Sequence, residues 1–213
     1  MKLSGARTLL VGALLCVLQV PAAAQVSTPA AHFGFPLGTD RRLATADAID
    51  QYFTLVSTQS DRVALLDLGA TTDGHRTIAA VVSAPENIRT LDRIRATNQQ
   101  LADPRSLTPE EAARLASTQK AIIAIGASVH SSEVGGTQAI AELLYELASA
   151  TDAETLSVLQ NVVVVLIPSM NPDGHRLVTD WYEKYKGTAW EGGPMPWLYQ
   201  STPGTTSTAT CSC

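Results

Sequence analysis

Two uninterrupted apolar runs, with an amphipathic segment between them, dominate the hydrophobic pattern of the chain. Residues 121–128 and 161–167 lack the alternation of a half-exposed strand, which is typical of strands covered on both faces. The segment between them has helical spacing, with an apolar stripe made of Ile140, Leu143, Leu144 and Leu147. This order predicts a βαβ unit whose two parallel strands end at the same edge of a sheet.

The segments before this unit predict three helices and a hairpin. Apolar positions at i, i+3, i+4 and i+7 favour a helix over 45–56, and short apolar runs at 63–68 and 77–82 flank the turn pair Asp73-Gly74. Pro85 begins a predicted helix that extends to Leu101. A further short helix follows the capping box that starts at Thr108.

Composition narrows the function classes. The chain has 213 residues, 45% of them hydrophobic and 16% charged, which suits one ordinary domain with a real core. The net charge of −5, without any basic run, predicts that nucleic acid is not a partner.

The N-terminus has the pattern of an export signal. Lys2 and Arg7 precede an apolar run at 9–20, and three small residues end at Ala24. We expect residues 1–24 to be a cleaved signal peptide that leaves no stable membrane anchor, because the run is too short to span a bilayer comfortably. The mature protein is then secreted or periplasmic.

His130 and Glu133 are the first candidates for chemistry. They follow the first apolar run, and their spacing of three on a turn puts an imidazole and a carboxylate on the same side, where both can bind one zinc ion. Gly135-Gly136, which begin two residues after Glu133, would permit close backbone approach. Alone the pattern is weak, and the alternative is a helix-capping histidine beside a solvated glutamate.

A second segment follows the next strand. Asn171-Pro172-Asp173-Gly174 is a turn by its prolines and glycine. His-x-x-Glu after one strand and Asn-Pro-Asp-Gly after the next together resemble the first two motif blocks of the zinc carboxypeptidases, the M14 metallopeptidases. The resemblance covers about residues 40–199, including the motifs at 52–53, 60–63 and 196–199.

The resemblance implies one catalytic Zn²⁺ per intact site, held by two histidines and one glutamate, and a peptide or protein C-terminus as substrate. His130 and Glu133 match the first two ligands. The family's third ligand, its substrate-binding Asn-Arg pair and its general-base glutamate have no match, since His32, His75 and His175 lie at other positions. We therefore assign no catalytic or substrate-binding residue within this chain.

The implied fold is α/β, a mixed, mostly parallel sheet with helices on both faces. We expect residues 25–200 to be the N-terminal part of such a domain, incomplete at its C-terminal side. A sheet that stops after the strand at 161–167 would leave an open edge and an uncovered apolar face, so poor solubility is expected.

Residues 201–213 differ in composition from everything before them. They are a Ser/Thr-rich, low-complexity run that ends with Cys211 and Cys213. Suitable codons read one base earlier would encode His-Pro-Gly-His-Asp-Ile-Asn-Arg-Asp, which resembles the missing Asn-Arg block. We therefore expect an out-of-frame tail here.

Three functions compete. The first is a zinc metallocarboxypeptidase that releases C-terminal residues from peptides, inactive as this shortened chain. The second is a non-catalytic truncated domain or binding module. The third is a zinc-dependent N-acyl amino acid amidohydrolase, which shares the His-x-x-Glu pair but does not lead us to expect Asn-Pro-Asp-Gly.

Overall fold

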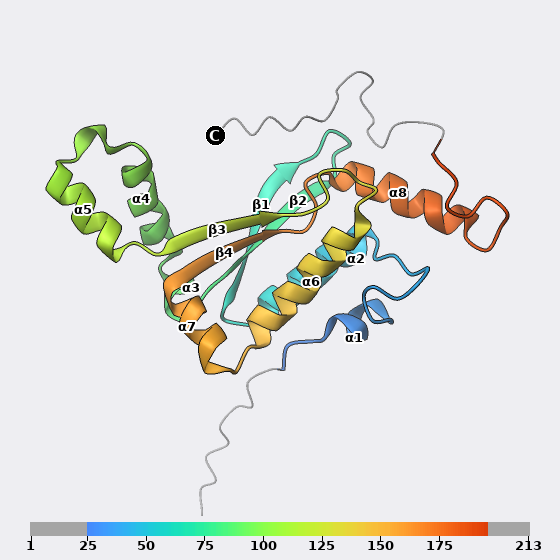
Figure 1. Cartoon of the computed structure of the whole chain (residues 1–213), viewed down its shortest axis with the longest axis horizontal. Helices are drawn as coiled ribbons and strands as arrows, with labels where there is room; N and C mark the ends of the chain where they lie inside the picture. Colours follow the sequence, from blue (N-terminus) through green and yellow to red (C-terminus); the bar gives the residue numbers. More distant parts are fainter. Residues whose placement is uncertain (1–24, 196–213) are drawn as a thin grey trace, which may run out of the picture.

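A computed structural model describes residues 25–195, which form a four-stranded mixed sheet with helices on both of its faces (Figure 1). The predicted signal peptide at 1–24 and the predicted out-of-frame tail at 201–213 lie outside the described residues.

The helices and strands follow the sequence patterns closely in the first two thirds of the chain. The order is α1 (Pro29–Phe33), α2 (Ala46–Gln59), β1 (Val63–Ala70), β2 (Arg76–Val82), α3 (Pro85–Arg89), α4 (Leu91–Ala102), the 3₁₀ turn η1 (Pro104–Ser106) and α5 (Pro109–Thr118). The predicted helix at 85–101 is two helices, because it breaks at Thr90. The capping box at Thr108 is confirmed.

The remaining elements contain the βαβ unit. They are β3 (Ala121–Gly126), α6 (Val134–Ser149), α7 (Ala153–Asn161), β4 (Val162–Ile167) and α8 (Pro172–Tyr185). Strands β3 and β4 pair in parallel, in register from Ala121 with Val162 to Gly126 with Ile167. The predicted parallel pair is thus confirmed, whereas α7 and α8 have no counterpart in the sequence prediction.

The sheet order is β1-β2-β4-β3, and this order corrects the predicted mostly parallel sheet. Strand β2 pairs with β1 and with β4, antiparallel in both cases, so only the β3–β4 pair is parallel. The reason is that the described residues contain a single βαβ crossover, while the β1–β2 hairpin docks against the free side of β4. Strand β4 is therefore internal, and the edge strands of the described sheet are β1 and β3.

The main core lies between one face of the sheet and helices α2 and α6, which lie side by side against it (Figure 1). Ile49, Phe53 and Val56 of α2 pack there with Leu144 of α6 and Leu166 of β4, and all five side chains are buried. This layer holds α6, and with it the loop that precedes α6, in a fixed place over β2 and β4.

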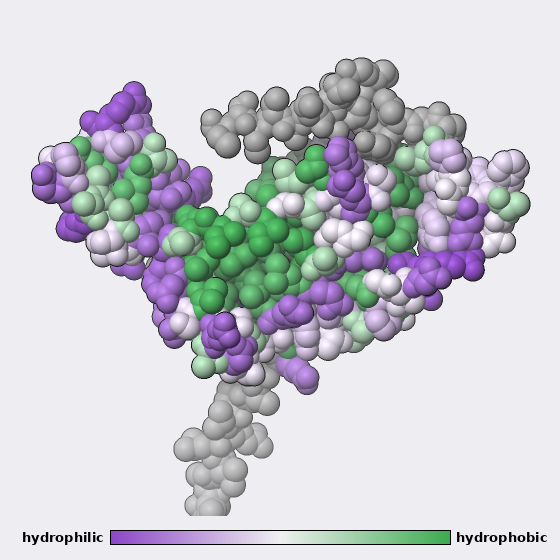
Figure 2. All heavy atoms as spheres, viewed as in Figure 1, coloured by the Kyte–Doolittle hydropathy of each residue, from purple (hydrophilic) through white to green (hydrophobic). Residues whose placement is uncertain are grey.

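The opposite face has a smaller core, formed where α3 and α4 cover one end of the sheet. Strand β3 is largely uncovered, with Ile122 and Ile123 exposed to 40% and 48%. Figure 2 shows the resulting hydrophobic surface over β3 and β4. The expectation that both faces of 121–128 are covered is wrong for the described residues, because nothing in residues 25–195 packs over most of this strand.

Candidate functional site

Backbone hydrogen bonds hold the two predicted motif segments together at the carboxyl ends of β3 and β4. The amide of Ala127 donates to Ile167 O (3.1 Å), and the amide of Met170 donates to Ala127 O (2.8 Å). At Gly126 an added Cβ would lie 2.8 Å from Met170 Sδ, so the flexible Met170 side chain would have to shift. The predicted closeness of the segments is confirmed by the two backbone hydrogen bonds. An added Cβ at Gly135 would meet nothing within 4 Å, and one at Gly136 would lie 3.4 Å from Ala127 Cβ.

Ser128 shapes the loop that leads into α6. Its φ of 54° is left-handed, a conformation that non-glycine residues rarely adopt. Its hydroxyl donates to Glu133 O (2.8 Å) and lies 2.7 Å from Thr137 Oγ1, so the loop folds back onto the first turn of α6. The amide of Glu133 also donates to His130 O (2.9 Å), which closes a tight turn.

This turn brings the two candidate ligands into contact. His130 Nδ1 lies 3.0 Å from Glu133 Oε1, and the two side chains are 55% and 57% exposed. The hydrogen bond with His130 holds the pKa of Glu133 below its usual range. An imidazole nitrogen and a carboxylate oxygen, this close and open to solvent, suit two positions of a zinc site.

A third ligand is missing from the described part of the chain. Nowhere in residues 25–195 do three or more His, Cys, Asp or Glu side chains gather in a way that could hold a metal. His175 is 1% exposed, and its Nε2 lies 3.1 Å from Ala44 O; His32 Nε2 lies 2.9 Å from Ala48 O. Cys211 and Cys213 lie outside the described residues. The residues present therefore fit two positions of a three-ligand zinc site and leave the set incomplete.

The segment at 171–174 begins a helix and does not merely form a turn. Asn171 caps α8, its Oδ1 accepting from the amide of Gly174 (3.0 Å), and Pro172 occupies the first helical turn. Asp173 accepts a hydrogen bond from Thr71 Oγ1 (2.6 Å), which ties α8 to the β1–β2 turn. These contacts are structural, and they fix where α8 leaves the sheet.

Arg176 of α8 forms an ion pair with Asp47 of α2. This contact helps to hold α8 against α2.

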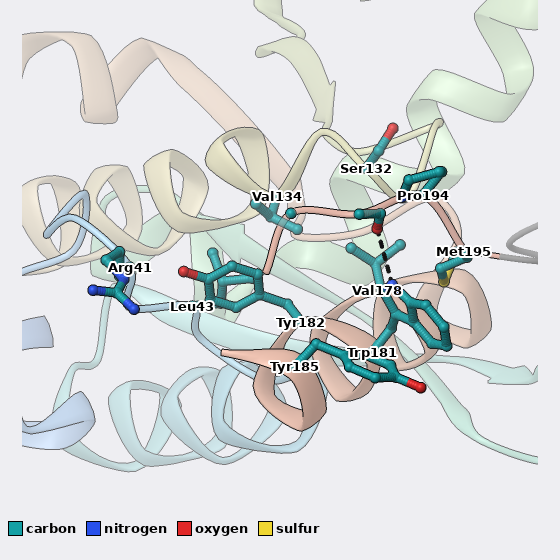
Figure 3. A pocket seen from close by; sticks show the side chains of 12 residues that line it. Arg41, Leu43, Ser132, Val134, Val178, Trp181, Tyr182, Tyr185, Pro194 and Met195 are labelled. Carbon is teal, nitrogen blue, oxygen red and sulfur yellow. Dashed lines mark hydrogen bonds between the residues drawn. The ribbon is translucent and has the colours of Figure 1, made fainter. Parts of the chain in front are cut away.

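A pocket of about 630 Å³ opens beside the candidate ligands, and sequence reasoning missed it (Figure 3). Its lining combines the loop before α2, the start of α6, the last turns of α8 and the residues that follow: Arg41, Leu43, Ser132, Val134, Val178, Trp181, Tyr182, Tyr185, Gly192, Gly193, Pro194 and Met195. The signal in the sequence is the spacing of Val178, Trp181, Tyr182 and Tyr185, which places four large side chains along one side of a helix.

Comparison with known proteins identifies the class. The sequence profile of the zinc carboxypeptidases, peptidase family M14, matches residues 49–193. The chain belongs to this family, as the resemblance had indicated. No curated protein sequence matches it.

Solved carboxypeptidase structures match parts of the chain. Carboxypeptidase A from Helicoverpa armigera aligns with 68% of this chain at 15% identity and a TM-score of 0.47. A metallo-carboxypeptidase from Burkholderia cenocepacia aligns with 58% at 19% identity and 0.40, and thrombin activatable fibrinolysis inhibitor with 72% at 12% identity and 0.44. The matched regions are 28%, 26% and 32% of those chains, so this chain spans only about a third or less of their length.

Within residues 25–195, no helix combines the length and the apolar character needed to cross a membrane.

Proposed function

We propose that this chain contributes the first two zinc ligands, His130 and Glu133, to a carboxypeptidase domain that releases C-terminal residues from peptides. The observation that carries the proposal is the 3.0 Å approach of His130 Nδ1 to Glu133 Oε1 at the carboxyl end of β3. Family membership supports the same activity. A zinc ion, when bound, lowers the pKa of a coordinated water and polarises the scissile carbonyl.

The chain's own residues do the positioning. Ser128 and Thr137 hold the loop onto α6, so that Glu133 lies directly at the start of that helix. The remaining ligand, the substrate clamp and the general base are absent from the matched motifs. We therefore expect weak zinc binding and no measurable peptide hydrolysis from the 213-residue chain alone.

Zinc binding to the purified 213-residue chain tests this proposal. The parent chain should bind zinc weakly, and dialysis against a mild chelator should remove the metal. His130→Ala and Glu133→Ala should each abolish even this weak binding in the absence of chelator, because one ligand alone holds zinc poorly. His75→Ala and Glu146→Ala are matched controls, since they remove a histidine from the β1–β2 turn and a glutamate from the exposed side of α6, both away from the candidate site. The controls should bind zinc like the parent chain.

A carboxypeptidase assay on blocked dipeptides completes the test. Zinc that survives dialysis at one ion per chain, with turnover that chelators abolish, would contradict the incomplete site. Zinc binding that is equal in the parent chain and in both ligand variants would overturn the assignment of His130 and Glu133.

We further propose that the protein acts outside the cytoplasm. The pattern of Lys2, Arg7, the apolar run and Ala24 supports this, and N-terminal sequencing of the mature protein should start at Gln25. A mature protein that starts at Met1 would refute export by a cleaved signal.

A further inference from the structure

The pocket beside the candidate ligands has the size and lining of a binding site. Its volume of about 630 Å³ is within the range of ligand sites. Figure 3 shows Trp181 at one end, beside Met195, and Arg41 at the other, with Leu43 and Val178 between them. A hydrogen bond from Trp181 Nε1 to Gly193 O (3.0 Å) fixes the indole and leaves its ring as an apolar wall.

The charge within the pocket is already neutralised. Arg41 Nε donates to Glu191 Oε1 at 2.7 Å, and its Nη2 donates to Glu191 Oε2. Glu191 also accepts from the amide of Gly187 (2.7 Å) and from Tyr182 Oη (2.8 Å). The hydrogen bond with Arg41, followed by these two, lowers the pKa of Glu191 to about 2. Because the guanidinium is engaged on both of these nitrogens by a carboxylate, the pocket favours a neutral ligand over an anionic one.

The pocket reaches the turn that carries the candidate metal pair. Ser132 and Val134 line it, and they are the residues on either side of Glu133. A molecule with one group in the pocket therefore has its adjoining atoms beside the His130–Glu133 turn. This placement suits a peptide, whose side chains and scissile bond are separated by a few bonds.

We infer that this pocket binds an apolar or aromatic side chain of the peptide substrate, upstream of the terminal residue. The identity of the ligand as a peptide rests on the proposed function. The upstream position follows from charge, because a terminal carboxylate requires a cation and the lining residue Arg41 is already paired with Glu191. Leu43, Val178 and Trp181 would remove the bound side chain from water.

Peptide binding to the 213-residue chain, with a chelator present, tests the inference. The probes are acetyl-Phe-Gly-Ala and acetyl-Glu-Gly-Ala, which differ only in the first residue, two positions before the C-terminal alanine. Burial of a phenylalanine side chain should give the first peptide about tenfold or more tighter binding by calorimetry. Equal affinities, or no binding of either peptide, would overturn the inference.

Two variants and one control test whether the preference for the phenylalanine peptide comes from this pocket. Val178→Trp fills the pocket and should abolish the preference for phenylalanine, while Val158→Trp, at a 46% exposed position on α7, should retain it. Glu191→Gln removes the charge that neutralises Arg41, so the glutamate peptide should bind more tightly. The difference in affinity between the phenylalanine and glutamate peptides should therefore become smaller. A preference unchanged in both Val178→Trp and Glu191→Gln would place the binding elsewhere and overturn the inference.

The zinc proposal fails independently of this result. Phenylalanine preference should persist in His130→Ala, because the pocket needs no metal. If it persists while the parent chain binds no zinc, the pocket stands as a peptide site and the zinc assignment fails. If zinc binds as expected but the two peptides bind equally, only the pocket inference fails.

Discussion

Ser128 is the residue whose replacement should affect the candidate site most directly without touching a ligand. Its side chain is buried, and its one hydroxyl proton goes to Glu133 O at 2.8 Å. Thr137 Oγ1, 2.7 Å away and fully buried, must then be the donor in the second bond. Ser128→Ala removes both bonds and leaves the Thr137 hydroxyl and the Glu133 carbonyl without this partner.

The expected loss is worked from these two bonds. Each contributes roughly 0.5–1.5 kcal/mol net, and a buried group left unsatisfied costs more, so Ser128→Ala should lower the unfolding free energy by about 2–3 kcal/mol. Ser128→Gly loses the same bonds but adopts the φ of 54° without a Cβ penalty. It should therefore be about 1 kcal/mol more stable than Ser128→Ala.

Urea unfolding, followed by circular dichroism, measures both variants. Ser117→Ala is the matched control, because its hydroxyl also bonds a backbone carbonyl (2.8 Å) but at an exposed position on α5, and it should change stability by less than about 0.5 kcal/mol. A double variant with Thr137→Val should lose less than the sum of the single losses, since the hydroxyls share one bond. Ser128→Ala at parent stability, or more stable than Ser128→Gly, would refute this account of the loop.

Two further predictions concern a half-buried carboxyl and the open strand edge. Burial raises the pKa of Asp50 to about 6 despite nearby Arg76 and Arg176, so its contribution to stability is present below about pH 4 and is lost as the pH rises to about 6. Asp50→Asn should therefore gain about 1 kcal/mol over the parent in urea unfolding between about pH 4 and about pH 7, after allowance for solvent screening, and a constant difference between the two proteins would contradict this. Ile123→Lys should reduce self-association of the chain in sedimentation experiments, because a charge on an exposed apolar edge strand opposes edge-to-edge pairing. Val158→Lys, an equal change away from the edge, should leave self-association unaltered, and equal effects of both would count against β3 as the contact.

The βαβ unit was predictable because its signals are local. Four consecutive valines, a continuous apolar run and the helical stripe through Leu144 specify two strands and a helix without reference to the rest of the chain. The contact between His130 and Glu133 was predictable for the same reason, as it depends on a spacing of three within one turn.

Burial and sheet direction were not predictable in this way, because they depend on what lies beside a strand. The apolar run at 121–126 shows that β3 is suited to a covered position, yet Ile122 and Ile123 remain exposed in the described structure. The antiparallel β2–β4 pair depends on where the hairpin docks, which no local pattern records.

Helix α8 was missed although its signals were present. Asn171 as N-cap and Pro172 in the first turn are typical of a helix start, but next to Asp173-Gly174 they were interpreted only as a turn. The missed helix also concealed the pocket, because Val178, Trp181 and Tyr182 line it only when they lie along one side of α8.

The two backbone hydrogen bonds of Ala127 position the loops after β3 and β4 without using any side chain of the candidate site. The loops after β3 and β4 are aligned by main-chain atoms, and any side chain other than proline leaves the amides of Ala127 and Met170 able to donate. Ligand identity at positions 130 and 133 can therefore change while the loops keep their alignment. Exchange of Glu133 for histidine or cysteine would make the same pair of loops a scaffold for metals of different softness, so the unit is a natural starting point for engineering metal preference.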